Sequence, residues 1–221
     1  MPTIILGMHR SGTSLVAGLL SHLGVFMGDD FASNDRLWCS YEDQQILSLN
    51  QQILTAAGGS WRKVPSVESI WKASHPYNER IQRLIRDRQQ YNLWGFKDPR
   101  TCLTISMWHH HLILWSPPPR YIVVWRERGA IVSSLLHRAI ATGDADLSEL
   151  ELSHLAGFYW GRLLNFIAIN HPQYHPIWYE QLIDPSTAEQ TAQDLATFAG
   201  VSYFDPSVLS FIHNRKLDPD A

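Results

Sequence analysis

The residues of this chain best suited to chemistry are cations that lie at or just past the ends of short apolar runs. Arg10, Lys97 and Arg126 each occupy such a position, and Tyr179 ends a fourth run. Apolar runs of this length are typical of buried strands. Arginine and lysine side chains gathered in one place bind phosphate and sulfate groups and stabilise negative charge that develops on oxygen. These four positions therefore predict a site for an anionic ligand.

The first of these cations lies in a glycine-containing loop from Gly7 to Ser14. Gly7 and Gly12 have the spacing of a P-loop, but Thr13 stands where a nucleoside triphosphatase has its lysine. Glycine allows backbone N–H groups to approach an anion, and the first turn of the following helix adds unpaired N–H donors and the positive end of its dipole. The loop therefore favours a phosphate-bearing ligand and argues against hydrolysis of ATP or GTP.

The elements that must position these side chains alternate between strand and helix along the chain. We expect strands over 3–6, 94–97, 121–125 and 176–179, and helices over 13–23, 42–57, 77–90, 129–141, 147–170 and 187–199. The stretch 60–77 is expected to be irregular, and 28–40 to be a polar connection. This alternation predicts an α/β fold, a P-loop-containing three-layer arrangement with a central parallel sheet flanked by helices. Because ligands of such sheets bind beyond the carboxyl ends of the strands, the four positions named above are expected to face one site.

The composition limits the class of protein. A length of 221 residues suits a single domain over 1–221, and 45% hydrophobic with 18% charged residues suits a folded core. A formal net charge of −3 gives no reason to expect nucleic acid as a partner. The two cysteines form no disulfide framework, and no apolar run approaches the ~20 residues of a membrane span. We therefore expect a cytoplasmic protein without a membrane span. The pattern indicates no oligomeric state.

The histidines 109–111 are the most conspicuous metal-like cluster in the sequence. Three consecutive residues of a helix cannot all face one metal ion, and proline-rich sequence follows them. We expect a solvated or partly packed turn there and no metal site.

Four segments of the chain together resemble the sulfotransferase family, which uses 3′-phosphoadenosine 5′-phosphosulfate (PAPS). Residues 10–14 look like the family's 5′-phosphosulfate loop, and 126–134 reproduce its 3′-phosphate motif, an arginine at a strand end with a serine eight residues later. Residues 94–100 resemble the Lys-Asp-Pro segment of the tyrosylprotein branch, and 179–185 resemble the Tyr-Glu strand end near the nucleotide. The arginine in the loop is similar to carbohydrate-type and tyrosylprotein-type members rather than to the lysine-bearing cytosolic phenol enzymes.

The resemblance implies a role for each matching residue. Arg10 would stabilise charge on the departing phosphate, and Lys97 would neutralise the sulfuryl group or the leaving oxygen. Arg126 and Ser134 would hold the 3′-phosphate, and Tyr179 would lie beside the adenosine. The remaining contacts to the phosphosulfate would come from Ser11, Gly12, Thr13 and Ser14. PAPS would be the co-substrate and 3′,5′-adenosine bisphosphate (PAP) the product, and fixed cations would stand in place of a metal.

The acceptor hydroxyl or amine also requires a base. Glu42, which lies where a loop enters a helix, is the expected base, and Asp43 and His9 are the alternatives. A small-molecule or carbohydrate-like acceptor is favoured by the branch resemblance, while glycolipid, peptide tyrosine and phenol stay open. Arg215 and Lys216 fall where family members often add contacts to the 3′-phosphate, but the usual C-terminal Arg-Lys-Gly loop is absent.

Two other functions fit the same fold. A P-loop small-molecule kinase would want a lysine at Thr13 and an acidic magnesium ligand after an apolar strand, where this chain has Arg126. A noncatalytic nucleotide-binding protein would keep the loop and lose the chemistry. Arg10, Lys97 and a candidate base count against the second alternative.

Overall fold

A four-stranded parallel sheet forms the centre of the molecule. The computed structural model describes residues 1–31, 40–142 and 147–216. Within them the strands β1 (Pro2–Leu6), β2 (Trp94–Lys97), β3 (Arg120–Trp125) and β4 (Tyr174–Trp178) pair in the order β2-β1-β3-β4. All three pairings are parallel, so the carboxyl ends of the strands lie at one edge. The four predicted strands are confirmed, with bounds that shift by no more than two residues.

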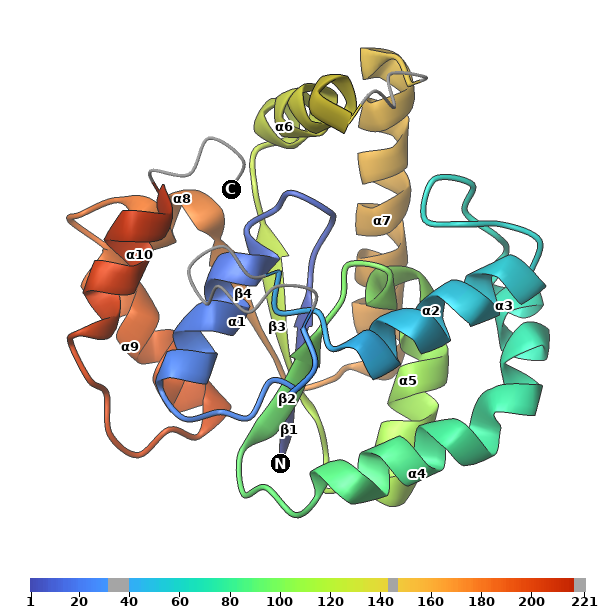
Figure 1. Cartoon of the computed structure of the whole chain (residues 1–221), viewed down its shortest axis with the longest axis horizontal. Helices are drawn as coiled ribbons and strands as arrows, with labels where there is room; N and C mark the ends of the chain where they lie inside the picture. The colour runs from blue at the N-terminus through green and yellow to red at the C-terminus, as the bar shows by residue number, and fades with distance from the viewer. Residues whose placement is uncertain (32–39, 143–146, 217–221) are drawn as a thin grey trace.

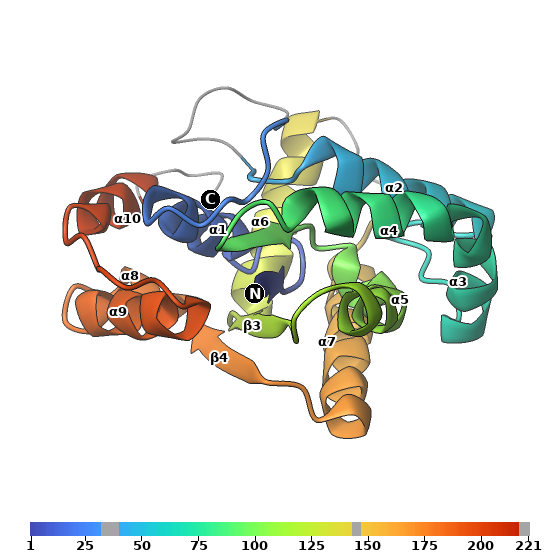
Figure 2. The same ribbon diagram turned by 90° about the horizontal axis from the view of Figure 1, so that it is seen from below.

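Helices cover both faces of the sheet (Figure 1), which confirms the predicted three-layer α/β fold. One layer contains α1 (Thr13–His22), α8 (Tyr179–Ile183), α9 (Ala188–Ala199) and α10 (Val208–Lys216). The other contains α2 (Gln44–Ala56), α3 (Val67–Ser74), the short 3-10 helix η1 (His75–Tyr77), α4 (Asn78–Arg88), α5 (Thr101–Trp115) and α7 (Glu149–Asn170). Helix α6 (Arg128–Thr142) follows β3 directly and lies beyond the carboxyl end of the sheet. Figure 2 shows the two helical layers from below, with β3 and β4 between them.

The hydrophobic core is divided by the sheet into two clusters. Ile4 and Leu6 of β1 face the cluster under α5 and α7, whereas Ile5 faces the cluster under α1 and α9. Successive residues of a strand point to opposite faces, and a parallel sheet covered on both sides is apolar on both. The two clusters therefore hold the carboxyl edge, where the candidate cations lie, in a fixed geometry.

Two predictions about local structure were wrong. The stretch 60–77 is not irregular, because α3 and η1 lie within it; Ser66 caps α3 by accepting a hydrogen bond from the Ser69 amide at 3.0 Å. The histidines 109–111 are not in a turn but in α5, where His109 contacts the Tyr121 hydroxyl and His111 contacts Asn78. Helix α5 is apolar nearly all round because it is enclosed by neighbouring elements, so it lacks the one-sided pattern that identifies a surface helix.

One cysteine lies in the buried part of the fold. Cys102 is a free, buried thiol, and Cys39 lies outside the described residues, as does most of the predicted connection 28–40. In the part of the chain that the structure describes, no helix is long and apolar enough to cross a membrane.

Candidate active site

The glycine loop between β1 and α1 is closely packed on both of its glycines. A Cβ on Gly7 would lie 2.5 Å from Ser11 Oγ and 3.0 Å from the Val124 carbonyl oxygen. Gly12 has φ +92, and a Cβ there would lie 2.2 Å from the ring of Tyr179. Both positions therefore require glycine, one because of close approach and the other because of conformation as well.

The amino terminus of α1 is open to an anion. Helices α2, α3 and α7 are capped by the side chains of Asp43, Ser66 and Ser148, but the N-cap of α1 is Gly12, which has no side chain, and its first turn has no acidic residue. The first N–H groups of a helix have no intrahelical partner. Together with the cations described next, this terminus can hold phosphate or sulfate oxygens.

The predicted 3′-phosphate residues meet the loop in one cluster, which we call the arginine cluster. Arg126 Nη1 donates to the Arg10 carbonyl oxygen at 2.8 Å, and its guanidinium lies 4.4 Å from the centre of the Tyr179 ring. Arg10 Nε donates to Ser134 Oγ at 2.7 Å. Arg126 therefore braces the loop backbone, and the Arg10 side chain reaches the helix expected to bind the second phosphate.

A second group, the lysine cluster, lies on the other side of the loop. Lys97, at the end of β2, is 2% exposed, and its Nζ donates to Glu42 Oε1 at 2.7 Å, Ser14 Oγ at 2.9 Å and the Ser40 carbonyl at 3.0 Å. Arg100 Nη1 lies 3.5 Å from Glu42 Oε2 and 2.7 Å from Asp98 Oδ1. The structure thus brings the expected base and the expected catalytic lysine into direct contact.

The lysine cluster sets the protonation state of Glu42. Burial raises the pKa of this carboxyl, but the Lys97 ammonium, with smaller contributions from His9 and Arg100, outweighs it and holds the pKa at about 2. Glu42 is therefore an ionised carboxylate at neutral pH, and its proton affinity depends on where the Lys97 charge is directed.

The two alternative bases have other surroundings. Asp43 caps α2 through the Gln45 and Ile46 amides and forms a 2.6 Å ion pair with Arg88 Nη2, so its oxygens are used in holding the helix. His9 is buried, and burial together with the nearby Arg100 charge lowers its pKa to about 3. Because burial is the main cause, moving one neighbouring charge does not restore the proton affinity of His9, whereas the low pKa of Glu42 depends on its Lys97 partner.

An aromatic wall stands beside the lysine cluster. The His9 ring lies 4.6 Å from the Trp61 ring and 6.0 Å from the Tyr159 ring, between centres. The Tyr159 hydroxyl donates to the Trp61 carbonyl at 3.1 Å, which ties the segment between α2 and α3 to α7. Neither aromatic residue was named individually as a site residue from the sequence, although both lie in segments, 60–77 and 147–160, that were expected to form walls for the acceptor. Their types carry no spacing signal, since tryptophan and tyrosine usually fill cores.

Asn50 was not predicted as a site residue, although the sequence pattern around it contains a signal. Its side chain is fully buried on the apolar face of α2, in line with Ile46 and Ile53. A polar residue in such a stripe indicates a buried hydrogen-bond network, and Asn50 donates to Asp98 Oδ2 at 2.8 Å.

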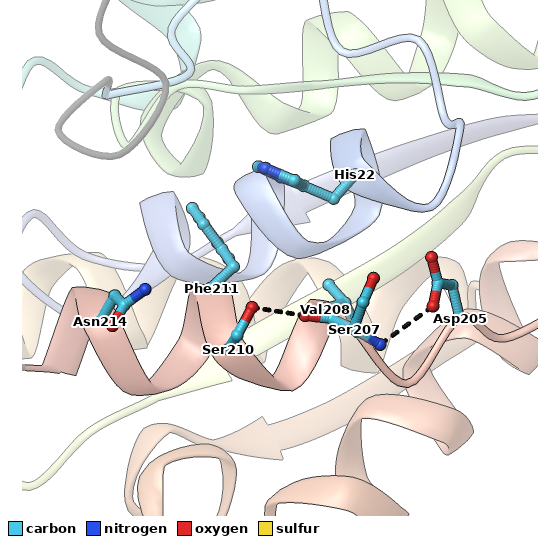
Figure 3. A pocket seen from close by; sticks show the side chains of 7 residues that line it. All are labelled: His22, Asp205, Ser207, Val208, Ser210, Phe211 and Asn214. Carbon is cyan, nitrogen blue, oxygen red and sulfur yellow. Dashed lines mark hydrogen bonds between the residues drawn. The ribbon is translucent and has the colours of Figure 1, made fainter.

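The C-terminal helix α10 borders the site from the α1 side. Arg215 is 6% exposed, and its guanidinium lies 5.7 Å from the centre of the Tyr41 ring. The side chain of Lys216 lies outside the described residues. A hollow of about 550 Å³ lies between α1 and α10 (Figure 3). It is lined by His22, the last residue of α1, and by Ser210 and Phe211 of α10, among others. This hollow is separate from the lysine cluster.

Comparison with solved structures places the fold in one class. The chain is similar to the sulfotransferase domain from the curacin biosynthetic pathway, with 18% identity, a TM-score of 0.58, and coverage of 96% of this chain and 78% of that one. It is similar to the sulfotransferase domain from the Synechococcus PCC 7002 olefin synthase, with 18% identity, a TM-score of 0.57, and coverage of 95% and 76%. No model of a protein family and no curated protein matches the sequence.

The chain therefore has the fold of the sulfotransferase domains, as the sequence resemblance predicts. Likeness at this identity defines the fold, and the activity has to be argued from the site itself.

Proposed function

We propose that the protein is a PAPS-dependent sulfotransferase. The observation that carries the proposal is the placement of two cationic clusters on either side of one glycine loop: Arg126, Arg10 and Ser134 on one side, Lys97 and Glu42 on the other. A nucleotide with phosphate groups at both its 3′ and 5′ positions matches two such anion sites. One of them adjoins the ionised carboxylate of Glu42.

Each of these residues has a separate role in sulfuryl transfer. An acceptor oxygen forms a bond to sulfur while the bond from sulfur to the 5′-phosphate oxygen breaks, and the acceptor proton passes to Glu42. Negative charge builds up on the departing phosphate, where the loop N–H groups and Arg10 stabilise it. Arg126 and Ser134 hold the 3′-phosphate, and Tyr179 forms the wall beside Arg126. PAP leaves as the product.

The Lys97 ammonium can pair with Glu42 before the donor binds and with the sulfuryl group afterwards. Without nucleotide its ammonium neutralises Glu42, which keeps the pKa of that carboxyl at about 2. Ser14, at the start of α1, already lies 2.9 Å from Lys97 Nζ, so the ammonium is within reach of a sulfuryl group held by the loop. Turning Lys97 toward that group removes the charge that lowers the pKa of Glu42, and the carboxylate becomes a better base. Donor binding therefore activates the base.

Binding of the product tests the donor. Thermal-shift titration with PAP should stabilise the protein, whereas ATP should have a much weaker effect. Arg126→Ala should abolish most of the PAP shift, because it removes the guanidinium that braces the loop and faces the second anion. Arg80, an exposed arginine of α4, provides the matched control: Arg80→Ala should keep the full shift. Stronger stabilisation by magnesium ATP than by PAP would favour the kinase.

Turnover tests the reaction and the acceptor. We propose a small-molecule acceptor that stacks against Trp61, whose carbonyl oxygen is held by the hydroxyl of the buried Tyr159, with carbohydrates and phenols as the first classes to examine. A screen with radiolabelled PAPS against sugars, phenols and tyrosine peptides should yield a labelled product with the wild type. Glu42→Gln should retain PAP binding and lose most of the turnover. A protein that binds PAP and transfers nothing to any acceptor class would be a noncatalytic nucleotide-binding protein.

A further inference from the structure

The side chain of Asn50 uses its full hydrogen-bonding capacity. Its Oδ1 accepts from Thr104 Oγ1 at 2.8 Å and from Trp108 Nε1 at 2.9 Å, both in α5. Its Nδ2 donates to Asp98 Oδ2 at 2.8 Å and to Thr101 Oγ1 at 3.0 Å. An amide has two donor hydrogens and two acceptor lone pairs, so all four bonds are made. No other side chain of this size can replace it without leaving a buried partner unpaired.

The network continues from Asn50 to the carboxylate of the candidate base. The other oxygen of Asp98, Oδ1, accepts from the Arg100 amide at 3.1 Å and from Arg100 Nη1 at 2.7 Å. The same Nη1 lies 3.5 Å from Glu42 Oε2, while Lys97 Nζ holds Oε1 at 2.7 Å. Both oxygens of Glu42 are thus contacted by cations from the segment 97–100, which begins at the last residue of β2. That segment is anchored to α2 through Asn50.

The position of Asn50 in α2 explains why its hydrogen bonds affect Glu42. Glu42 lies immediately before Asp43, the N-cap of α2, whereas Lys97 is the last residue of β2 and Arg100 follows that strand. Asn50 is the residue of α2 that is hydrogen-bonded to the 97–100 segment, since it bonds directly to Asp98. We propose that Asn50 is a positioning residue for the transfer reaction: through Asp98 and Arg100 it fixes the Glu42 carboxylate relative to Lys97. This inference rests on the proposed sulfotransferase function.

The charge state of Asp98 supports this role. Burial raises its pKa, and the hydrogen bond from Asn50 is one of the contacts that lower it again. Without the Asn50 donor, the Asp98 carboxyl would take up a proton more readily and hold the Arg100 guanidinium less firmly. Arg100 would then be free to leave Glu42. The amide of Asn50 therefore acts two contacts away from the base.

Kinetics of two variants test the proposal. Asn50→Leu removes the four hydrogen bonds at similar volume, and Asp98→Asn keeps the shape but removes the charge that holds Arg100. We expect kcat to fall about 10- to 100-fold, as for small misplacements of a reacting group, with the acceptor KM and the PAP affinity changed less than about twofold. Tyr121→Phe is the control, because it removes a buried hydroxyl that contacts His109 of α5 outside this network; its kcat should stay at the wild-type value.

A measurement without turnover separates positioning from the proposed reaction. In protein labelled with ¹³C at the glutamate carboxyl, the signal lost in Glu42→Gln identifies Glu42. In the wild type this signal should stay that of a carboxylate down to pH 4, because the pKa is about 2. In Asn50→Leu, the midpoint should rise above about 2 because Arg100 holds Glu42 Oε2 less firmly, while Lys97 keeps it below the ordinary 4.5.

Two outcomes would overturn the positioning role. One is an unchanged Glu42 titration with unchanged kcat in Asn50→Leu. The other is loss of PAP binding in parallel with kcat in both variants, which would assign Asn50 to the nucleotide loop. Failure of the wild type to bind PAP would instead overturn the proposed function, and the titration of Glu42 would still decide the role of Asn50.

Discussion

Two residues beside the candidate site adopt a backbone conformation that is unusual for their type. Arg10 has φ 67 and Tyr41, which precedes Glu42, has φ 53. The left-handed region costs a residue other than glycine roughly 1–2 kcal/mol. Strain of this kind persists where the surroundings fix it, and it is concentrated at functional sites. Here it directs one side chain to each cluster: Arg10 to Ser134, and the residue after Tyr41 to Lys97.

The Lys97–Glu42 ion pair predicts how acid affects stability. The folded-state pKa of Glu42 lies at about 2, below its ordinary 4.5. A carboxyl with a lowered pKa stabilises the fold above its unfolded-state pKa, and this contribution disappears as pH falls through the folded-state value. We therefore expect the wild type to lose on the order of 2–3 kcal/mol of unfolding free energy through this group between pH 5 and 2.

Denaturant unfolding of wild type and Glu42→Gln at several pH values checks this expectation. The variant leaves Lys97 without its carboxylate, so it should be less stable at pH 7, and the difference between the two proteins should shrink toward pH 2. A difference that is constant over the whole range would mean that Glu42 is not held by Lys97 in solution.

His9 predicts an effect in a higher pH window. Its pKa falls from 6.5 to about 3 on folding, mainly through burial. The neutral imidazole is therefore the form that the fold accepts, and stability present above pH 6.5 is lost as the pH falls toward 3. His9→Gln should remove this loss between pH 6.5 and 4.5, where Glu42 stays ionised. An acid dependence between pH 6.5 and 4.5 that is as steep in His9→Gln as in the wild type would contradict this expectation.

The sequence predicted the charged residues of the site better than their partners. Arg10, Lys97, Arg126 and Ser134 were expected from motif and strand-end position, and the structure places Arg10 on Ser134 and Lys97 on Glu42. The roles assigned to them stay predictions. Asn50 was missed because its importance depends on a contact between segments about 50 residues apart. Spacing along one segment does not encode such contacts.

At the scale of elements, the turn from β1 to α1 can be tested with a matched pair of glycines. Gly12 and Gly24 have nearly the same conformation, with φ +92 and +87. A Cβ on Gly24 would meet nothing within 4 Å, whereas one on Gly12 would lie 2.2 Å from Tyr179. Gly24→Ala should cost about 1 kcal/mol of stability, from backbone strain alone. Gly12→Ala should cost clearly more and should also weaken PAP binding, because Tyr179 and the Arg126 that lies over it must move.

Unfolding and PAP titration of both variants measure the two effects separately. An equal decrease in the free energy of unfolding of the two variants would show that the Tyr179 ring moves aside without destabilising the fold. Unchanged PAP affinity in Gly12→Ala would show that the loop is not part of the binding site.

A helix was predicted from the sequence when one of its faces is buried and the other faces solvent. Helices α2, α4 and α9 carry an apolar face against the core and a polar face toward solvent, and each was predicted within about two residues. Helix α5 was missed because Cys102, Met107, Trp108 and their neighbours are buried around much of its circumference. Helix α3 was missed because it is short and lies between prolines at 65 and 76.

At the scale of the whole molecule, the parallel sheet explains why the site could be predicted at all. Four strands in one direction bring their carboxyl ends to one edge, so residues from 10 to 179 converge without any local signal of contact. Alternation of strands and helices was sufficient to predict this arrangement. The order β2-β1-β3-β4 was not predicted, because it depends on which apolar faces pack together, and many of the segments are apolar on all sides.

The C-terminal helix links the stability of one layer to nucleotide binding. The Phe211 side chain points from α10 toward α1 (Figure 3). It packs where Gly18 of α1 has no side chain, since a Cβ there would lie 2.3 Å from the ring. One turn later, Arg215 reaches the Tyr41 ring beside the site. Phe211→Ala should cost about 3–5 kcal/mol of stability, as is usual for a buried phenylalanine, and should also weaken PAP binding because Arg215 loses its support.

Phe166 of α7, which is 3% exposed in the other cluster, supplies the control for this prediction. Phe166→Ala should destabilise the fold by a similar amount, since it removes a ring that packs against His109 and Tyr121. Its PAP affinity, measured by calorimetry well below the unfolding temperature, should stay at the wild-type value because none of these rings contacts the glycine loop or α10. If both variants lose affinity equally, the effect is one of general stability. If neither does, α10 is not part of the nucleotide site, and the anion sites are completed by the loop and α6 alone.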